Sequence, residues 1–99
     1  MAITKAEARK LLGECPEEKI FWVNDGKTLK KLADLETALK EMSDDTFRFH
    51  ANETKNDFIK WVDEVIGDPR LATDLAKAAT RLQAARAVGI RISSLLRVR

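Results

Sequence analysis

The spacing of apolar residues over the last third of the chain constrains its fold most. They recur at intervals of three or four residues: Leu71, Leu75, Ala78, Leu82, Ala85, Gly89, Ile92 and Leu96. This spacing places all of them on one side of a helix. The preceding pair Asp68-Pro69 supplies an N-cap and a proline at the first helical position. We therefore expect a long helix that begins at Pro69 and buries one apolar stripe.

Gly89 leaves the extent of this helix open. A helix unbroken to Leu96 would be roughly 42 Å long at ~1.5 Å per residue, longer than a compact domain of this size covers, so that part of it would overhang. Alternatively, Gly89 ends one helix and starts a shorter one, and residues 69–99 fold back onto the core. In the overhanging form, small residues such as Ala78, Ala85 and Gly89 suit close pairing with a second subunit.

Capping residues and apolar periodicity predict four shorter helices earlier in the chain, over about 5–12, 31–42, 44–50 and 56–66. Thr4 and Glu7 form a capping box for the first, which Gly13 would end in a left-handed conformation. Ser43 caps the third. The fourth begins at Asn52 or Asn56 and ends at Gly67. It carries a broad apolar stripe that we expect in the core: Phe58, Trp61, Val62, Val65 and Ile66.

A β-hairpin is predicted between the first two of these helices. The run from Ile20 to Val23 is β-branched and aromatic, and it is followed by Asp25-Gly26, a pair that favours a primed turn. In such a hairpin Phe21 and Val23 pack on helices, and Trp22 points to the other side. Apolar residues make up 44% of the chain and charged residues 34%, which is typical of a globular chain.

The sequence therefore predicts a mainly α fold. We expect a compact bundle of about five helices with a small two-stranded β-hairpin. Residues 1–99 should form a single domain, because one core serves a chain of this length.

Charge is distributed unevenly along the chain. The last 30 residues carry 7 basic side chains and 1 acidic one, whereas the preceding 69 carry 11 basic and 15 acidic. Such a cationic segment can meet phosphates, or it can face the acidic remainder of its own domain. On a helical wheel Arg81 and Arg91 lie along one edge of the apolar stripe, and Arg86 and Arg97 lie along the other. This placement favours packing and ion pairing over a single basic face.

The chain offers few residues for catalysis or metal binding. A single histidine and a single cysteine, His50 and Cys15, lie 35 positions apart, which suits no zinc site. No glycine-rich phosphate motif is present, and no serine lies in a nucleophile elbow. We expect His50 to be structural, bonded to a backbone carbonyl or to Asn52, Asn56 or Asp57. The sequence thus predicts no catalytic residues, no metal and no cofactor.

The compartment is predicted from the same residues. One cysteine cannot form an intramolecular disulfide, which argues for a reducing environment. The first residues lack the apolar stretch of a signal peptide, and the longest apolar run is far shorter than the ~20 residues of a membrane span. We therefore expect a cytoplasmic protein that does not enter a membrane.

Several segments together resemble a known family. They are Phe21-Trp22-Val23-Asn24-Asp25-Gly26, the leucine-rich stretch 32–39, Met42 to Phe47, and the block from His50 through Lys55-Asn56-Asp57-Phe58 to Trp61. In these residues the chain resembles a family of small, mainly archaeal, uncharacterised helical proteins classed as a domain of unknown function. The resemblance implies a cytoplasmic helical domain, alone or fused to others, and assigns no activity, ligand or catalytic residue.

Function is therefore predicted from the absence of a catalytic constellation and from the C-terminal helix. We expect a non-catalytic protein–protein interaction or assembly module that docks a protein partner or forms a homodimer. The alternative is a nucleic-acid-binding accessory protein that uses the basic C-terminal helix. No small-molecule substrate is identified. The candidate interaction surface comprises Trp22, Arg81, Arg86, Arg91 and Arg97.

Overall fold

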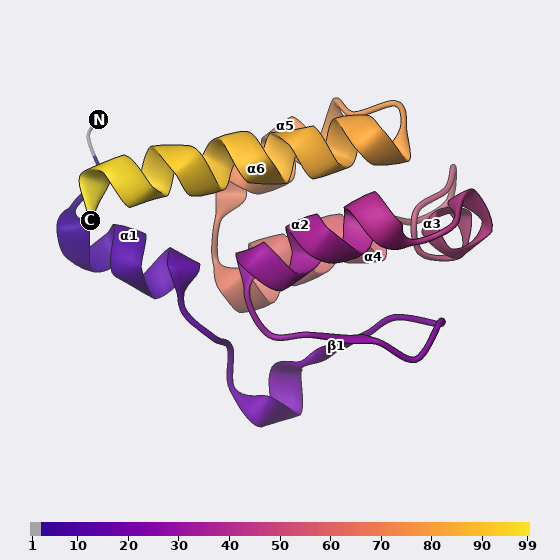
Figure 1. The fold of residues 1–99 in the computed structure, drawn as a ribbon, viewed down its shortest axis with the longest axis horizontal. Coiled ribbons are helices and arrows are strands. Elements are labelled where there is room, and N and C mark those ends of the chain that lie inside the picture. Colours follow the sequence, from indigo (N-terminus) through magenta and orange to yellow (C-terminus); the bar gives the residue numbers. More distant parts are fainter. Residues whose placement is uncertain (1–2) are drawn as a thin grey trace.

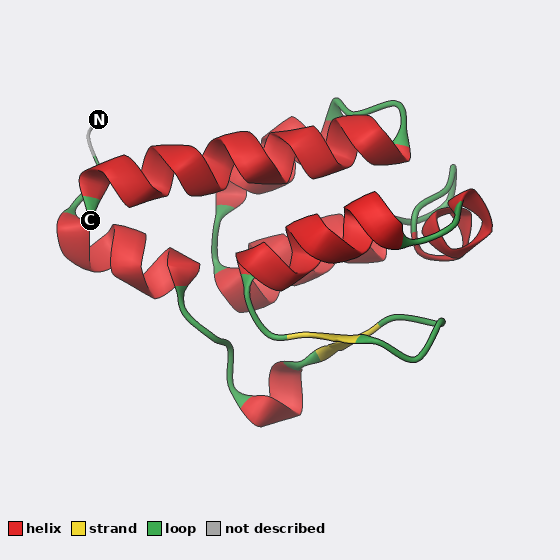
Figure 2. Cartoon of the chain, viewed as in Figure 1, coloured by secondary structure: helices red, strands yellow, loops and turns green. Residues whose placement is uncertain are grey.

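A computed structural model of the chain describes residues 3–99, which form six α-helices and one antiparallel pair of strands (Figures 1 and 2). In chain order the elements are α1 (Lys5–Leu12), the 3₁₀ turn η1 (Glu17–Lys19), β1 (Phe21–Trp22), β2 (Thr28–Leu29), α2 (Leu32–Glu41), α3 (Asp44–His50), α4 (Asp57–Trp61), the π-helical turn η2 (Val62–Ile66), α5 (Pro69–Ala76) and α6 (Arg81–Val98). The predicted mainly α fold with a small hairpin is confirmed.

Helix α6 organises the packing. It is the longest element and contacts α2, α1 and α5, and the hairpin packs on α2 at the side away from α6 (Figure 1). The buried apolar side chains form one cluster. Its most deeply buried large members come from β2, α2, η2, α5 and α6: Leu29, Leu32, Leu35, Leu39, Val62, Leu71, Val88 and Leu95. Helices α1 and α4 add Leu11 and Trp61 to the same cluster, so the hairpin and the helices α1, α2, α4, α5 and α6 share one core.

Both predictions for the C-terminal helix are wrong: residues 69–96 form neither one unbroken helix nor two helices that divide at Gly89. The chain leaves the helix after Ala76 and begins α6 at Arg81, and α6 then continues unbroken through Gly89. The new start is fixed by capping: the Thr80 hydroxyl accepts from the Gln83 amide at 3.1 Å, and Gln83 Oε1 accepts from the Ala79 amide at 2.7 Å. Because these bonds satisfy amides at the N-terminus of α6, the chain can turn back over the core and no helix overhangs.

The predicted apolar stripe holds in α5 and only in part in α6. Leu71 and Leu75 are buried as expected. In α6 Ala85 is buried as predicted, but the rest of the buried face is formed by Ala84, Val88 and Leu95, whereas Leu82 is 61% exposed and Leu96 is 45% exposed. The break at 77–80 uncouples the rotation of α6 from that of α5. The contact with α2 then determines which residues of α6 face the core.

Most of the predicted helix ends are confirmed. Thr4 and Glu7 form the capping box of α1, and the side chains of Ser43 and Asn56 accept from amides in the first turns of α3 and α4. Gly67 has a φ of 81°, which favours glycine, and it ends the helical segment 57–66. The last turn of this segment widens because the amide of Gly67 donates to the carbonyl of Val62, five residues back.

Two local expectations are wrong. Gly13 is extended, with φ −79° and ψ 173°, because the chain runs on from α1 towards the hairpin instead of reversing. The hairpin turn is not a primed two-residue turn, since no described residue other than glycine has a positive φ. Val23 and Lys27 pair across a three-residue loop in which Gly26 has a φ of 95°. Asp25 accepts from the Lys27 amide at 3.0 Å and stabilises this loop.

Candidate functional site

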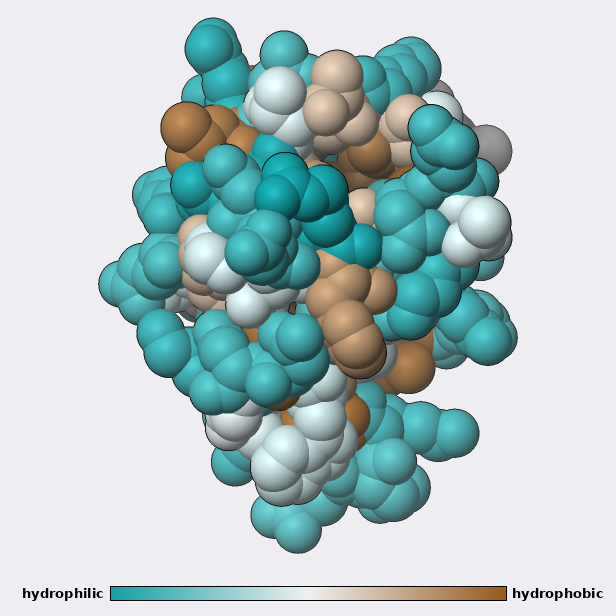
Figure 3. Space-filling view, turned by 90° about the vertical axis from the view of Figure 1, so that its right-hand side faces the viewer, coloured by the Kyte–Doolittle hydropathy of each residue, from teal (hydrophilic) through white to brown (hydrophobic). Residues whose placement is uncertain are grey.

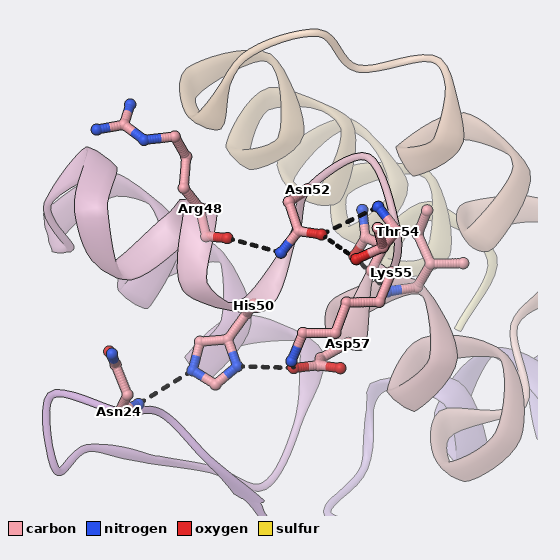
Figure 4. Close-up of polar contacts among 9 residues, drawn as sticks. Asn24, Arg48, His50, Asn52, Thr54, Lys55 and Asp57 are labelled. Carbon is pink, nitrogen blue, oxygen red and sulfur yellow. Dashed lines mark hydrogen bonds and ion pairs between the residues drawn. The ribbon is translucent and has the colours of Figure 1, made fainter.

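His50 lies between two polar partners from different parts of the chain (Figure 4). It ends α3 and is 5% exposed. Its Nε2 lies 3.0 Å from the backbone amide of Asn24 in the hairpin loop, and its Nδ1 lies 3.0 Å from Oδ2 of Asp57 at the start of α4. Since an amide only donates and a carboxylate accepts, the imidazole is assigned as the neutral form with its proton on Nδ1.

Both nitrogens of His50 are therefore engaged, and this decides what the group can do. A general base needs an open lone pair within reach of a substrate proton, and the Asn24 amide takes up the lone pair of Nε2. The expected bond to Asp57 is confirmed, whereas the Asn24 amide was not among the predicted partners. The cluster ties the hairpin to the junction of α3 and α4.

Asp57 is held as a carboxylate in this cluster. Lys55 Nζ donates to the same Oδ2 at 3.0 Å (Figure 4). Burial by itself would raise the pKa of Asp57, but the hydrogen bonds from Lys55 and His50 outweigh it, and the pKa is lowered. The charge of Asp57 therefore supports the fold.

Aromatic rings enclose the apolar side of His50. Phe21 and Phe58 lie 5.1 and 5.4 Å from its ring, and Phe21 also contacts Trp61 edge-on. Trp61 is 6% exposed, and its indole nitrogen donates to the Lys19 carbonyl at 2.8 Å. The predicted core position of Phe58 and Trp61 is confirmed. These rings hold the hairpin on α4 and are not a platform for a planar ligand.

Trp22 lies on the outer face of the hairpin, as predicted, and is 70% exposed. Phe49 on α3 is also exposed, and Lys55 Nζ lies 5.2 Å above its ring. Figure 3 looks onto the α3 and hairpin end of the molecule and shows hydrophobic colour only in separate small patches on a mainly hydrophilic face. Single exposed apolar residues of this kind are common on folded proteins.

Arg81, a predicted interaction residue, is bound within its own chain. Its Nη1 donates to the carbonyls of Leu39 and Lys40 at 2.7 and 3.0 Å, and its Nε donates to Asp44 at 3.0 Å. These carbonyls are at the C-terminal end of α2, where a cation is favourable. Arg81 therefore joins the start of α6 to the turn between α2 and α3.

Arg91, a second predicted interaction residue, forms a two-point ion pair with Asp68. Its Nε and Nη2 lie 2.8 and 3.1 Å from the two carboxylate oxygens, and Asp68 is fully buried. Oδ1 of Asp68 also accepts from the Leu71 amide at 3.1 Å, so the same side chain caps α5. The ion pairing expected for these arginines is thus made with Asp44 and Asp68.

Arg86 and Arg97 are the predicted arginines that stay exposed, and no described residue forms an ion pair with them. They lie along a groove of about 730 Å³ between α2 and α6. Two large apolar side chains of α6 also line it, Leu82 at 61% exposed and Ile90 at 60% exposed. We call this feature the α2–α6 groove.

Two small residues of α6, Ala85 and Gly89, let this helix pack closely on α2. A methyl group added at Gly89 would collide with the carboxylate of Glu36, so the side chain of Glu36 lies directly over Gly89. Glu36 also pairs with Lys40 at 3.2 Å. Ala85 is buried within the same chain. The predicted notches at Ala85 and Gly89 are thus used for packing α6 on α2.

The predicted interaction residues do not form one surface. Trp22 lies on the hairpin, on the other side of α2 from α6 (Figure 1). Arg81 and Arg91 hold helices together, and only Arg86 and Arg97 border the α2–α6 groove. Sequence reasoning missed Leu82 as an exposed residue because it extended one stripe across the break. The pattern Thr80-x-x-Gln83, which has the form of a capping box, signals that break.

Among residues 3–99, no group of three or more potential ligands is placed to hold a metal ion. Burial raises the pKa of the Cys15 thiol, which reduces its thiolate fraction near neutral pH. A second hollow, of about 600 Å³, lies between α1, α5 and α6, and its buried acid Asp68 is already paired with Arg91.

Among the described helices, none has the length and the apolar run that crossing a bilayer requires. Comparisons of the chain with protein-family models, with curated proteins and with solved structures find no match.

Proposed function

We propose that this chain is a non-catalytic protein-interaction module that binds a protein partner through the α2–α6 groove. The observation that carries the proposal is the exposure of Leu82 and Ile90, 61% and 60%, on one helix beside a groove of about 730 Å³. Large apolar side chains that line a concave surface gain free energy when a partner removes them from water.

The state of the arginines supports a protein partner over nucleic acid. Arg81 and Arg91 have their charges matched by Asp44 and Asp68, so the basic C-terminal segment presents far less free charge than its composition suggests. Affinity for nucleic acid grows with the number of phosphates that basic side chains neutralise. Four basic side chains of this segment form no ion pair with a described residue: Lys77, Arg86, Arg97 and Arg99. Only Arg86 and Arg97 border the groove, where apolar side chains separate them, so they offer few phosphate contacts on that face.

The cytoplasmic location and the non-catalytic role belong to the same proposal. The lone Cys15 fits a reducing compartment, and His50 has both ring nitrogens bonded within the fold. The His50 cluster then acts as a structural clamp for the hairpin, while the α2–α6 groove is the binding surface.

Site-specific photo-crosslinking in cells that produce the protein tests the proposal. A photoreactive residue is placed at Leu82 or at Ile90, with Glu17 as a control. Glu17 is exposed and belongs to η1, the turn before β1, and this segment lies on the side of the molecule away from α6 (Figure 1). We expect one discrete protein adduct from positions 82 and 90 and none from 17. The captured protein, once purified, should bind the wild-type chain at least about tenfold more tightly than Leu82→Glu, a difference of ~1.4 kcal/mol.

Leu96→Glu is the matched control variant in that binding assay, because Leu96 is an exposed leucine of α6 that does not line the groove. It should bind as wild type does. No adduct at 82 or 90, or equal adducts from position 17, would contradict the proposed function.

A further inference from the structure

The charges of the α2–α6 groove point to the chemistry of its partner. Its charged lining residues are Glu36, Lys40, Arg86 and Arg97. The one acid among them, Glu36, is largely covered and already lies 3.2 Å from Lys40 Nζ. Arg86 and Arg97 meet no acid among the described residues. The groove therefore presents a surplus of two positive charges beside exposed apolar side chains.

The shape of the groove suits a helix. It is formed by α2 and α6, which lie side by side and run in opposite directions (Figure 1). Along α6 Leu82, Arg86 and Ile90 follow one another about one turn apart, and Arg97 lies about two turns beyond Ile90, after Ser93 and Ser94. A third helix can settle between two packed helices, and an amphipathic helix in an apolar groove is a recurring mode of peptide recognition.

We infer that the partner presents an acidic amphipathic helix to the α2–α6 groove, an inference that rests on the proposed function. Its apolar face covers Leu82 and Ile90, and its carboxylates pair with Arg86 and Arg97. These two arginines are separated by three turns of α6, so the acids of the partner should be spaced about three helical turns apart, with leucine-like residues between them.

A second copy of this chain is a poorer occupant. A two-fold dimer sets the same face against itself, so Arg86 and Arg97 would approach arginines of the other copy. Two like charges about 4 Å apart repel by ~1 kcal/mol even in water and by more where water is excluded. The acid that could relieve this repulsion, Glu36, is already paired with Lys40.

Two synthetic peptides of about 18 residues test the inference, a length near the point where isolated helices become stable in water. Both carry the same leucine face, and they differ only in having Glu or Lys at the flanking positions. Binding to the full chain is measured by fluorescence anisotropy at two salt concentrations. We expect the Glu peptide to bind at least about tenfold more tightly than the Lys peptide, and to weaken as salt increases.

The variant Arg86→Glu/Arg97→Glu should reverse this preference, because both positions are exposed and the substitution inverts their charge. Arg70→Glu is the charge control: Arg70 is exposed on α5 outside the groove and should leave both affinities unchanged. Circular dichroism checks that each variant is folded. A Lys peptide that binds as tightly as the Glu peptide would overturn the inference.

The remaining outcomes separate this inference from the proposed function. Equal binding of both peptides that is lost in Leu82→Glu rejects the acidic partner and keeps the groove as a protein-binding surface. Binding of neither peptide also rejects the acidic helix, while the crosslinking result decides the proposed function on its own. A concentration-dependent dimer in sedimentation analysis that Leu82→Glu abolishes identifies a second copy as the occupant. Random duplex DNA is the last probe. If it binds in a salt-sensitive way and Arg86→Glu/Arg97→Glu abolishes this binding, both the acidic helical partner and the proposed protein-binding function are rejected.

Discussion

Asp68 and Arg91, 23 residues apart in the chain, form a two-point ion pair in which the carboxylate is fully buried. The acid caps α5 and the base comes from the middle of α6, so the pair joins the turn after Gly67 to the longest helix of the fold. Burying a charge is costly unless it is matched, and here two hydrogen bonds from Arg91 and one from the Leu71 amide match it.

Removing one member of this pair should therefore be strongly destabilising. Arg91→Ala leaves the Asp68 charge buried without a partner, and we expect it to lower the free energy of unfolding by about 3–5 kcal/mol in urea denaturation. Arg86→Ala is the matched control on the same helix, and a loss within ~0.5 kcal/mol is expected because Arg86 is exposed. Similar losses for the two variants would show that the buried pair does not support the fold.

Asp57 should make stability depend on pH at the acidic end. The fold lowers the pKa of Asp57 from its ordinary value of 3.8. Its carboxylate therefore stabilises the protein at pH values above the pKa of the unfolded chain, and this contribution is lost as the pH falls through the pKa of the folded protein. The difference in unfolding free energy between wild type and Asp57→Asn should be constant near neutral pH and shrink below about pH 4. Lys55→Met removes one donor to this carboxylate and should reduce that pH-dependent difference. A difference that grows on acidification would contradict the lowered pKa.

The effect of Gly89→Ala on the stability of the protein should depend on Glu36. In the interior of a helix, replacing glycine by alanine usually stabilises by ~0.5–1 kcal/mol. Here the new methyl group meets the Glu36 carboxylate, which must turn aside and loosen its pair with Lys40. We expect Gly89→Ala to give the full gain in a Glu36→Ala background and a smaller gain, or none, in the wild type, as measured by a double-mutant cycle in urea. A cycle with no coupling energy would mean that Glu36 does not lie over Gly89.

The exposure of two leucines shows how α6 is rotated about its own axis against the core. Leu95 is fully buried, whereas Leu82 is 61% exposed. We expect Leu95→Ala to cost about 2–5 kcal/mol and Leu82→Ala to stay within ~0.5 kcal/mol of wild type, both measured by thermal and urea unfolding. A larger loss of stability in Leu82→Ala than in Leu95→Ala would contradict this rotation and agree with the stripe predicted from a continuous helix.

Local signals in the sequence predicted the elements well. The capping residues Thr4, Ser43, Asn56 and Asp68 each act within three residues of their own position, so their roles follow from the chain alone. The break before α6 also had a local signal in Thr80-x-x-Gln83, which the longer apolar periodicity concealed. Core positions of α4 followed in the same way from the spacing of Phe58 and Trp61.

The binding surface could not be predicted in this way. Whether an arginine is free or matched depends on which acid lies opposite it, and the partners of Arg81 and Arg91 are 37 and 23 residues away. Whether Leu82 is buried depends on how α6 is rotated against α2 after the chain has turned at 77–80.

By itself the sequence determined where most helices begin, which fold class they form and that a hairpin joins them, because capping and periodicity act within a few residues. Tertiary structure alone decided that His50 clamps the hairpin through Asn24. It also left Arg86 and Arg97 beside an open groove. The physical reason is that burial and ion pairing over long sequence separations depend on the relative rotation of packed helices, and short-range propensity does not specify that rotation.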